Sequence, residues 1–333
     1  MADWHAIAVE IRAAAPGIDV ALDAPLGVFT TYRVGGPASL MVHPVNRAQL
    51  DAVAEVLSGI HPHDAGGALP VIAVGNGSNL LIADTGFDGV ALRLGEGFAT
   101  IDVTGTSCRA GAAALLPVVA RQTVAAGLTG FEWAVGVPGT IGGAVRMNAG
   151  GHGSDMAACV SDADVLDLAT ATIERWSVDR LDFGYRRSAL QRRHVVLSAE
   201  LVLSEGEAER GNAALAEIVR WRREHQPGGH NAGSVFTNPP GDSAGRLIDA
   251  SGCKGLRVGT AEVSAKHANF IQVDDGGSAA DVRSVMAEVR RRVHDAFGVV
   301  LHPETHMVGF AGPLDDLAVD GEDRNEDSEE EAG

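Results

Sequence analysis

The sequence predicts an α+β fold in which two mixed units precede a smaller C-terminal one. Residues 20–95 alternate between strand-like and helix-like patterns, which is typical of a small α/β unit. Residues 163–178 and 194–203 alternate apolar and polar side chains, as antiparallel strands do. Residues 279–297 place valines at helical spacing, which indicates an amphipathic helix. The chain is 45% hydrophobic over 333 residues, so it can bury a sizeable core.

The expected elements follow in order along the chain. Apolar residues recurring every three or four positions predict helices at residues 2–14, 47–58, 112–126, 211–224 and 279–297. Apolar runs and alternation predict strands at residues 40–42, 69–74, 89–94, 163–178, 194–203 and 299–301, with short strands within 256–275. Glycine and proline mark loops at residues 24–36 and 226–245. We therefore expect an N-terminal helix in 1–20, mixed units at 21–98 and 99–206, and a third α/β unit at 207–310.

The formal charge of −18 is concentrated near the C-terminus. Residues 315–333 contain ten acidic residues and one arginine, which is half of that charge, and show no apolar periodicity. We expect residues 311–333 to form a disordered acidic tail. The remaining body is also acidic, which argues against nucleic-acid binding because phosphate backbones attract a positive surface. Small molecules are the expected partners, and a monomer is the expected state.

Three further observations point to the cytoplasm. The chain starts Met-Ala-Asp-Trp-His, without the basic and apolar regions of a signal peptide. No apolar run is long enough for a membrane helix, so we expect no membrane insertion. Cys108, Cys159 and Cys253 are odd in number and widely spaced, which argues against a disulfide framework.

Two glycine-rich segments are candidates for binding a phosphate or a flat ligand. The segment GNGSNLL at 75–81 follows a predicted strand, and its free backbone N–H groups could cradle a phosphate. It is not a dinucleotide-binding fingerprint, because Leu80 stands where the third glycine belongs. The segment VPGTIGGAVRMNAG at 137–150 is too apolar for a linker and too glycine-rich for a helix or strand. An ordinary tight turn and a buried packing loop are the alternatives.

Two further segments carry candidate catalytic side chains. In FGYRRS at 183–188, Arg186 lies beside an aromatic residue and could grip a carboxylate with two N–H groups. In NAGSVFTNP at 231–239, Ser234 sits in a turn of small residues where its hydroxyl can be exposed. It is not part of a GxSxG nucleophile motif. A surface arginine and a hydroxyl that bonds its own backbone are the alternatives.

Glu304 follows the last predicted strand, where an acid is either solvated or part of a site. His302 and His306 have the spacing of two metal ligands on one helix turn, but Pro303 precludes a regular helix there. We expect no metal site.

Seven motifs, in order from about residue 30 to 309, resemble the UDP-N-acetylenolpyruvoylglucosamine reductase family, flavoenzymes of bacterial peptidoglycan precursor synthesis. Each motif alone is weak, and their number and order make the resemblance specific. The chain has no tyrosine-bearing insertion between residues 187 and 231, so it resembles the shorter subtype. The motifs are YRVGGPA at 32–38, GNGSNLL at 75–81, VPGTIGGAVRMNAG at 137–150, FGYRRS at 183–188, NAGSVFTNP at 231–239, AGRLID at 244–249 and EVSAKHANFI at 262–271.

This resemblance implies a fold and a reaction. The fold would be a PCMH-type FAD-binding domain of two α/β subdomains, 21–98 and 99–206, followed by a substrate-binding domain at 207–310. NADPH would reduce FAD, and the enolpyruvyl ether of UDP-N-acetylglucosamine would then be reduced to UDP-N-acetylmuramate. By the resemblance, Ser234 is the proton donor, and Arg186 and Glu304 hold the substrate carboxylate and stabilise the intermediate.

The resemblance also implies binding residues. Backbone N–H groups would hold the FAD pyrophosphate, which suits an acidic protein without a basic phosphate patch. The expected FAD-binding residues are Arg33, Gly75, Asn76, Gly77, Ser78, Asn79, Val137, Pro138, Gly139, Thr140, Gly142, Gly143, Asn148, Ala149 and Gly150. The expected substrate-binding residues are Tyr185, Gln226, Asn238, Lys254, Lys266 and Asn269.

Two departures from the family pattern concern the diphosphate of the UDP-sugar. His225 stands where the family often has a lysine, and Gly229-His230 precede the small-residue turn where a Tyr-Pro pair is common. We expect Lys254 or Lys266 to meet the diphosphate. Two alternatives are an FAD-dependent oxidase of the same flavin fold and a nucleotide-sugar binding module without turnover.

Overall fold

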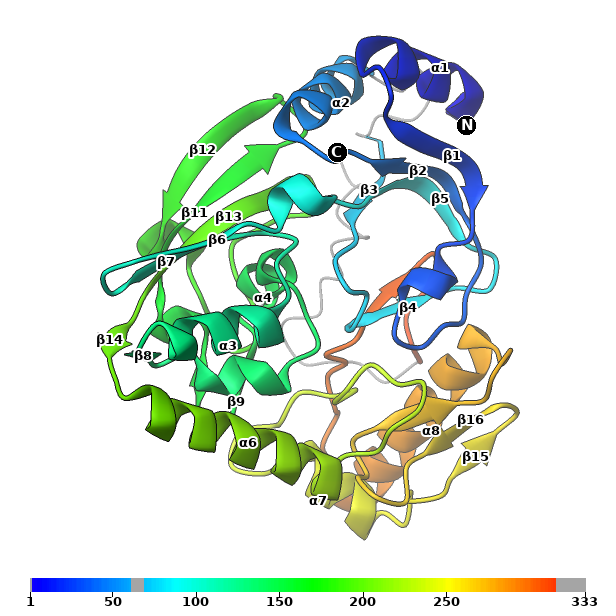
Figure 1. The fold of residues 1–333 in the computed structure, drawn as a ribbon. Coiled ribbons are helices and arrows are strands. Elements are labelled where there is room, and N and C mark those ends of the chain that lie inside the picture. The colour runs from blue at the N-terminus through cyan, green and yellow to red at the C-terminus, as the bar shows by residue number, and fades with distance from the viewer. Residues whose placement is uncertain (1, 61–68, 316–333) are drawn as a thin grey trace.

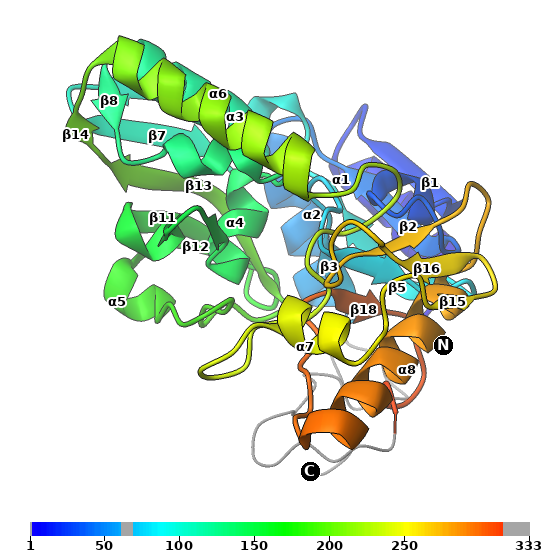
Figure 2. The ribbon, with the colours of Figure 1, turned by 90° about the horizontal axis from the view of Figure 1, so that it is seen from below.

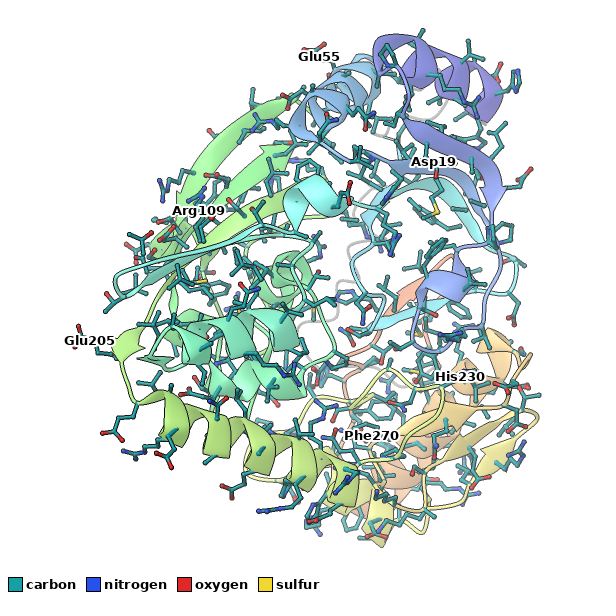
Figure 3. The ribbon with its side chains drawn as sticks, viewed as in Figure 1. Asp19, Glu55, Arg109, Glu205, His230 and Phe270 are labelled. Carbon is teal, nitrogen blue, oxygen red and sulfur yellow. The ribbon has the colours of Figure 1, made fainter. Side chains whose placement is uncertain are left out.

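Three groups of elements surround a common centre in the computed structural model, which describes residues 2–60 and 69–315 (Figure 1). Each group has its own hydrophobic core, and Figure 3 draws the side chains on the same view of the fold. Most of the predicted acidic tail, residues 316–333, lies outside the described residues. Its first residues, 311–315, lie against the C-terminal helix, where Arg283 donates to the carbonyl of Gly312 (3.2 Å) and Arg290 pairs with Asp315 (3.0 Å).

The first group is a four-stranded mixed sheet with two helices. The sheet has the order β1-β2-β5-β3, with β1 antiparallel to β2 and the other pairs parallel. Asn46 caps α2 by accepting from the amide of Gln49 (3.0 Å), and Leu50 and Val53 then point into the core. The elements are α1 (Trp4–Ala14), β1 (Asp19–Ala24), β2 (Ala38–His43), α2 (Arg47–Gly59), β3 (Val71–Ala73) and β5 (Phe87–Leu92).

The second group is a five-stranded antiparallel sheet of order β12-β11-β13-β7-β6, covered by α3, α4 and α6 (Figures 1 and 2). Its strands are β6 (Ile101–Thr104), β7 (Ser107–Gly111), β11 (Val160–Asp167), β12 (Thr172–Ser177) and β13 (His194–Val202). Its helices are α3 (Leu116–Ala125), α4 (Ile141–Met147), α5 (Val178–Leu181) and α6 (Ala208–His225). Two further antiparallel pairs are short. The strand β8 (Leu128–Thr129) pairs with β14 (Ser204–Glu205), and β9 (Gly150–Gly151) forms a hairpin with β10 (Ser154–Asp155).

The helix α6 belongs to this second group. Leu215 is buried in the core that α3 forms with the sheet, and Ile218 packs against the same core. The predicted boundary between 206 and 207 falls before α6, whereas the third core takes its residues from Ala232 onward and from the segment around Tyr32.

The third group is a three-stranded antiparallel sheet packed on a long helix. Its elements are α7 (Ala244–Ala250), β15 (Arg257–Val258), β16 (Ala261–Val263), β17 (Ile271–Val273) and α8 (Ala279–Phe297). The valines that predicted α8, among them Val282, Val285 and Val289, are buried against this sheet. The chain then returns to the first group, where β18 (His306–Val308) pairs in parallel with β4 (Leu80–Ile82).

Two local predictions are wrong. The segment 137–150, expected to be neither helix nor strand, contains α4. Gly142 packs there on Ala112 so closely that a Cβ would lie 3.0 Å from the Ala112 methyl group, so packing outweighs the low helix propensity of glycine. The strand expected at 299–301 is absent from the described structure, and the final strand is β18, which has β4 as its partner.

Candidate functional site

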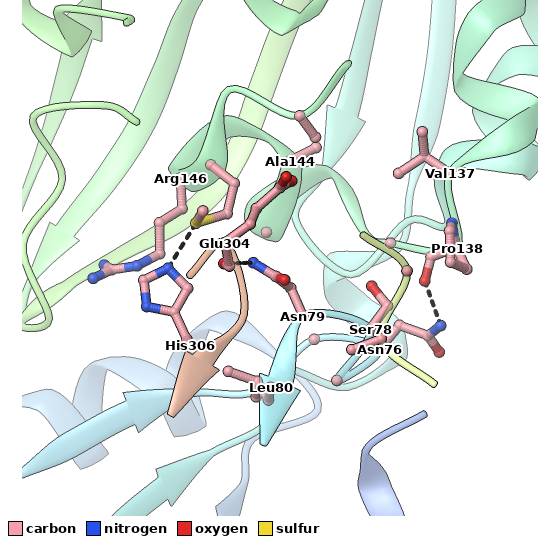
Figure 4. Close-up of a pocket in the computed structure, with 18 of the residues that line it drawn as sticks. Asn76, Ser78, Asn79, Leu80, Val137, Pro138, Ala144, Arg146, Glu304 and His306 are labelled. Carbon is pink, nitrogen blue, oxygen red and sulfur yellow. Dashed lines mark hydrogen bonds between the residues drawn. The ribbon is translucent and has the colours of Figure 1, made fainter. Parts of the chain in front are cut away.

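A cleft of about 340 Å³ lies where the three groups meet, and Figure 4 shows part of its lining. This volume is within the range of small-molecule sites. Every group contributes to the lining. The predicted site residues that line it are Gly75, Asn76, Gly77, Ser78, Asn79, Val137, Pro138, Gly139, Thr140, Gly143, Ala149, Gly150, Tyr185, Arg186, Gln226, Ser234, Asn238, Asn269 and Glu304.

Arg186 and Glu304 form an ion pair across the cleft. The Arg186 Nε lies 3.0 Å from the Glu304 Oε1, and both side chains are about four-fifths buried. Arg186 also donates to the carbonyl oxygens of Gly150 (3.1 Å) and Asn148 (3.5 Å). A guanidinium has five N–H donors, so two remain for another acceptor. The pair is therefore a fixed cation with spare donors beside a carboxyl group.

Burial raises the pKa of Glu304, and the neighbouring Arg186 opposes that shift. Backbone contacts place this carboxyl group. The Glu304 amide donates to the Val235 carbonyl (2.7 Å), and the Asn79 side-chain amide donates to the Glu304 carbonyl (2.9 Å), as drawn in Figure 4. The segments that contain Asn79, Val235 and Glu304 therefore meet at the backbone of Glu304, and Ser234 directly precedes Val235.

The turn that carries Ser234 is held from two sides. The Gly233 amide donates to the Asn231 side chain (3.0 Å), and Gly233 has a φ of +78°, which glycine adopts without strain. The Asn269 side chain bonds both the amide (3.0 Å) and the carbonyl (2.8 Å) of Phe236. Asn269 lines the cleft, but its polar atoms hold the loop after Ser234.

The two predicted glycine-rich segments face each other in the cleft. The Asn76 side chain donates to the Pro138 carbonyl (2.5 Å), as Figure 4 shows. A Cβ on Gly75 would collide with the Thr140 hydroxyl, and one on Gly77 would collide with the Phe29 carbonyl. Both glycines therefore let their loop pack closely on the neighbouring segments, and residues 75–79 line the cleft as one glycine-rich cradle. This cradle fits the phosphate-bearing cofactor that the sequence predicts.

The cleft is positively charged although the chain is acidic. Arg146, Arg192 and Arg222 line it together with Arg186, and Glu304 is the only acid among the described lining residues. The expectation of a protein without a basic phosphate patch is therefore wrong for this cleft. The cations come from three separate parts of the chain, namely α4, the connection between α5 and β13, and α6, so no basic run in the sequence indicates them.

Five predicted binding residues do not line this cleft. Gly142 lines a smaller adjoining pocket of about 150 Å³. Asn148 ends α4 with a φ of +40°, and its side chain holds the Gly184 carbonyl (2.9 Å) and the Ala157 amide (2.9 Å). Arg33 has a φ of +56° and lines neither space.

The two lysines also lie outside both linings. Lys254 pairs with Asp249 (2.7 Å), and Lys266 donates to the Arg223 carbonyl (2.6 Å). Neither is in position for a ligand in the cleft, contrary to the expectation that one meets a diphosphate there.

His306 is a lining residue that the sequence did not single out as a ligand contact. It is the first residue of β18, two positions after Glu304, and Figure 4 shows its ring beside Arg146. Its Nε2 is 2.9 Å from the Met147 sulfur. Although His306 is an exposed residue, the surrounding atoms of the cleft walls reduce the hydration of its ring, and this effect, with the charges of Arg146 and Arg192, lowers its pKa to about 4.

Comparisons with known proteins identify the family of the chain. A family model described as the C-terminal domain of UDP-N-acetylenolpyruvoylglucosamine reductase matches residues 225–308, and a model of an FAD-binding domain matches residues 42–177. The reductase of Paramagnetospirillum magneticum is 45% identical over 292 residues, covering 87% of this chain and 92% of that protein.

The chain belongs to the UDP-N-acetylenolpyruvoylglucosamine reductase family.

Two other members support the assignment. The reductase of Acidiphilium cryptum is 40% identical over 316 residues, covering 93% of this chain and 96% of that protein. The crystal structure of the Thermus caldophilus reductase matches with a TM-score of 0.73 and 36% identity, covering 87% of this chain and 98% of that one. The predicted family, the α+β fold with its PCMH-type domain, and the FAD cofactor of this reductase are confirmed. Within residues 2–60 and 69–315, no helix has the length and apolarity to cross a membrane.

Proposed function

We propose that this chain reduces the enolpyruvyl ether of UDP-N-acetylglucosamine to UDP-N-acetylmuramate, with NADPH as the reductant and FAD as the carrier. The observation that supports this most directly is the Arg186–Glu304 pair beside the Ser234 turn. The chemistry that FAD supplies when bound is hydride transfer from NADPH to the double bond.

Arg186 and Glu304 act on the substrate carboxylate. Hydride addition at the methylene carbon moves the electron pair onto the adjacent carbon and its carboxylate, which then carries the charge of an enediolate. The two spare donors of Arg186 meet that charge, because the guanidinium is already fixed by Glu304 and by the Gly150 carbonyl. With its raised pKa, Glu304 is poised to share a proton with the same oxygen.

Ser234 completes the addition by giving its hydroxyl proton to the carbon that bears the carboxylate. A free serine is a very weak acid, but the carbanionic carbon is strongly basic, so transfer is favourable over a short distance. The turn keeps the hydroxyl in place through Asn231 and Gly233. Water then restores the serine proton.

The segments 75–79 and 137–143 would hold FAD along their backbones, and Arg146 and Arg192 would offset its charge. Tyr185, Gln226 and Asn238 serve the UDP-sugar from the opposite wall. The partners are these small molecules, and the enzyme works as a cytoplasmic monomer, where NADPH and nucleotide sugars are available.

Stimulated NADPH oxidation tests the reaction. We expect purified protein to be yellow, to release FAD on denaturation, and to oxidise NADPH faster when the enolpyruvyl UDP-sugar is added. The variant Ser234→Ala should keep reduction of the flavin by NADPH and lose reduction of the substrate. Equal loss of both half-reactions would contradict the role of Ser234 as proton donor. Oxygen as the only acceptor would favour the oxidase, and binding without turnover would favour the nucleotide-sugar module.

A further inference from the structure

The end of α6 presents a cation to the cleft without an acidic partner. Arg222 lines the cleft and is partly buried, and it makes no ion pair or side-chain hydrogen bond within residues 2–60 and 69–315. By contrast, Arg186 is paired with Glu304, and Arg146 donates to the Gln191 carbonyl (2.8 Å). A partly buried guanidinium with no acidic partner among the described residues carries a positive charge that a bound anion would balance, so this position favours an anion.

Gln226 adds an unused polar group one helical turn later. It lines the cleft beside Arg222, and its buried Oε1 has no hydrogen-bond partner in the described structure. Gln226 is the residue directly after α6, and its amide donates to the Arg222 carbonyl (2.8 Å), so the two residues are neighbours at the helix end. Among the described residues, neither the Arg222 guanidinium nor the Gln226 Oε1 has a side-chain hydrogen-bond partner, and both residues line the cleft.

Packing fixes the position of Arg222. Its side chain lies on Gly136, where a Cβ would come within 3.0 Å of the Arg222 Cδ. The neighbouring Trp221 packs edge-to-face on His152 at the tip of the β9–β10 hairpin, with ring centroids 5.1 Å apart. The same hairpin accepts a hydrogen bond from Arg186 at Gly150. The β9–β10 hairpin therefore contacts Arg186 on one side and, on the other, the helix residue next to Arg222.

We propose that Arg222, with Gln226 beside it, binds the diphosphate of the UDP-sugar. This inference rests on the proposed function, in which one sugar carries the diphosphate on C1 and the enolpyruvyl carboxylate on the oxygen of C3. It also assigns the anion contact that Lys254 and Lys266 do not make, since both lie outside the lining. A planar guanidinium suits this role because it can donate two parallel hydrogen bonds to phosphate oxygens.

The test compares UDP with uridine in equilibrium binding to the FAD-loaded protein. Calorimetry of the wild type should show UDP binding at least tenfold more tightly than uridine. In Arg222→Gln this preference should fall to about threefold or less, with uridine affinity unchanged. Arg222→Lys should retain part of the preference for UDP, because lysine keeps the positive charge but cannot donate two parallel hydrogen bonds. The matched control is Arg223→Gln, which removes the same charge from the adjacent position, where the side chain is exposed.

Two outcomes would overturn the inference. One is a UDP preference in Arg222→Gln and Arg222→Lys equal to that of the wild type. The other is an unchanged UDP preference together with loss of FAD or a shifted flavin reduction potential, which would assign Arg222 to the cofactor. A wild type that prefers UDP but shows no NADPH oxidation with the enolpyruvyl UDP-sugar would reject the proposed reaction and leave the assignment of Arg222 supported.

Discussion

Asp84 accepts a hydrogen bond from the Ser278 hydroxyl (2.7 Å) and so joins the first group of elements to the third. The same carboxylate accepts from the amides of Ala279 (2.9 Å) and Ala280 (3.0 Å), the first two residues of α8. A helix begins with amides that lack internal partners and with partial positive charge, so a carboxylate is well suited to this position. The longest helix in the described structure is therefore capped by a residue almost two hundred positions earlier.

We expect Asp84→Ala to lower the free energy of unfolding by about 1–2 kcal/mol, because it leaves the helix amides without this acceptor. Urea denaturation of the purified protein measures the effect. Asp84→Asn, which keeps an acceptor oxygen without the charge, should lie between the alanine variant and the wild type. An alanine variant as stable as the wild type would show that Ser278 alone suffices as the cap.

Arg186→Lys should lower kcat/KM by about 10²-fold, although it keeps the positive charge. An ammonium group cannot reach the Glu304 carboxylate, the Gly150 carbonyl and a substrate oxygen with the same fixed geometry. Steady-state kinetics with the enolpyruvyl UDP-sugar measures the loss. The matched control is Arg187→Lys, since Arg187 is exposed and pairs only with exposed Asp182 among the described residues. Equal activity of the two variants would argue against contact between Arg186 and the substrate.

Gly77→Ala should reduce both FAD retention and stability. Gly77 has a φ of +60°, and an added Cβ would collide with the Phe29 carbonyl, so the loop between β3 and β4 must shift. The unfavourable backbone conformation alone costs about 1–3 kcal/mol. The ratio of flavin to protein absorbance and a thermal melt measure the two effects. Gly59→Ala, where a Cβ meets no atom within 4 Å, is the control and should retain FAD fully.

His306 predicts a pH dependence of stability in the FAD-free protein. Its pKa is lowered to about 4, whereas an unfolded histidine titrates near pH ~6.5. Between these values the unfolded chain binds a proton that the folded chain does not, so the free energy of unfolding falls as the pH falls through this window. His306→Gln should therefore lose less stability than the wild type between about pH 7 and about pH 5. Parallel denaturation curves for the two proteins would contradict the lowered pKa.

Local patterns predicted most of the fold. The valines of α8 and the capped helix α2 have strong helical spacing, and both helices form within one residue of the expected positions. The two wrong predictions concern segments whose structure depends on contacts with distant parts of the chain. Gly142 is accepted in α4 because Ala112 packs against it, and β18 forms because β4 offers a free edge. Neither partner is visible from the neighbouring sequence.

The residues of the candidate site also fall into two groups, those that local sequence could single out and those that it could not. The segments of Arg186, Ser234 and Glu304 could be singled out, because each motif or position has local chemistry, and the structure brings their residues to one cleft. The positive charge of the cleft could not be predicted, since Arg222 is one of several arginines on α6 and only its packing on Gly136 distinguishes it. Lys254 and Lys266 are the only two lysines in the sequence, but the rarity of a residue type carries no information about its position in the fold.

The parallel pairing of β18 with β4 has a consequence for synthesis of the protein. The strand that follows the glycine-rich segment 75–79 acquires its β18 neighbour only after residue 308 has been translated. A nascent chain can form the antiparallel sheet of the second group early, but it lacks Glu304 and the closing strand until nearly the whole length has left the ribosome. Fragments released prematurely therefore cannot carry out the reaction, and cofactor loading is expected to be a late, post-translational event.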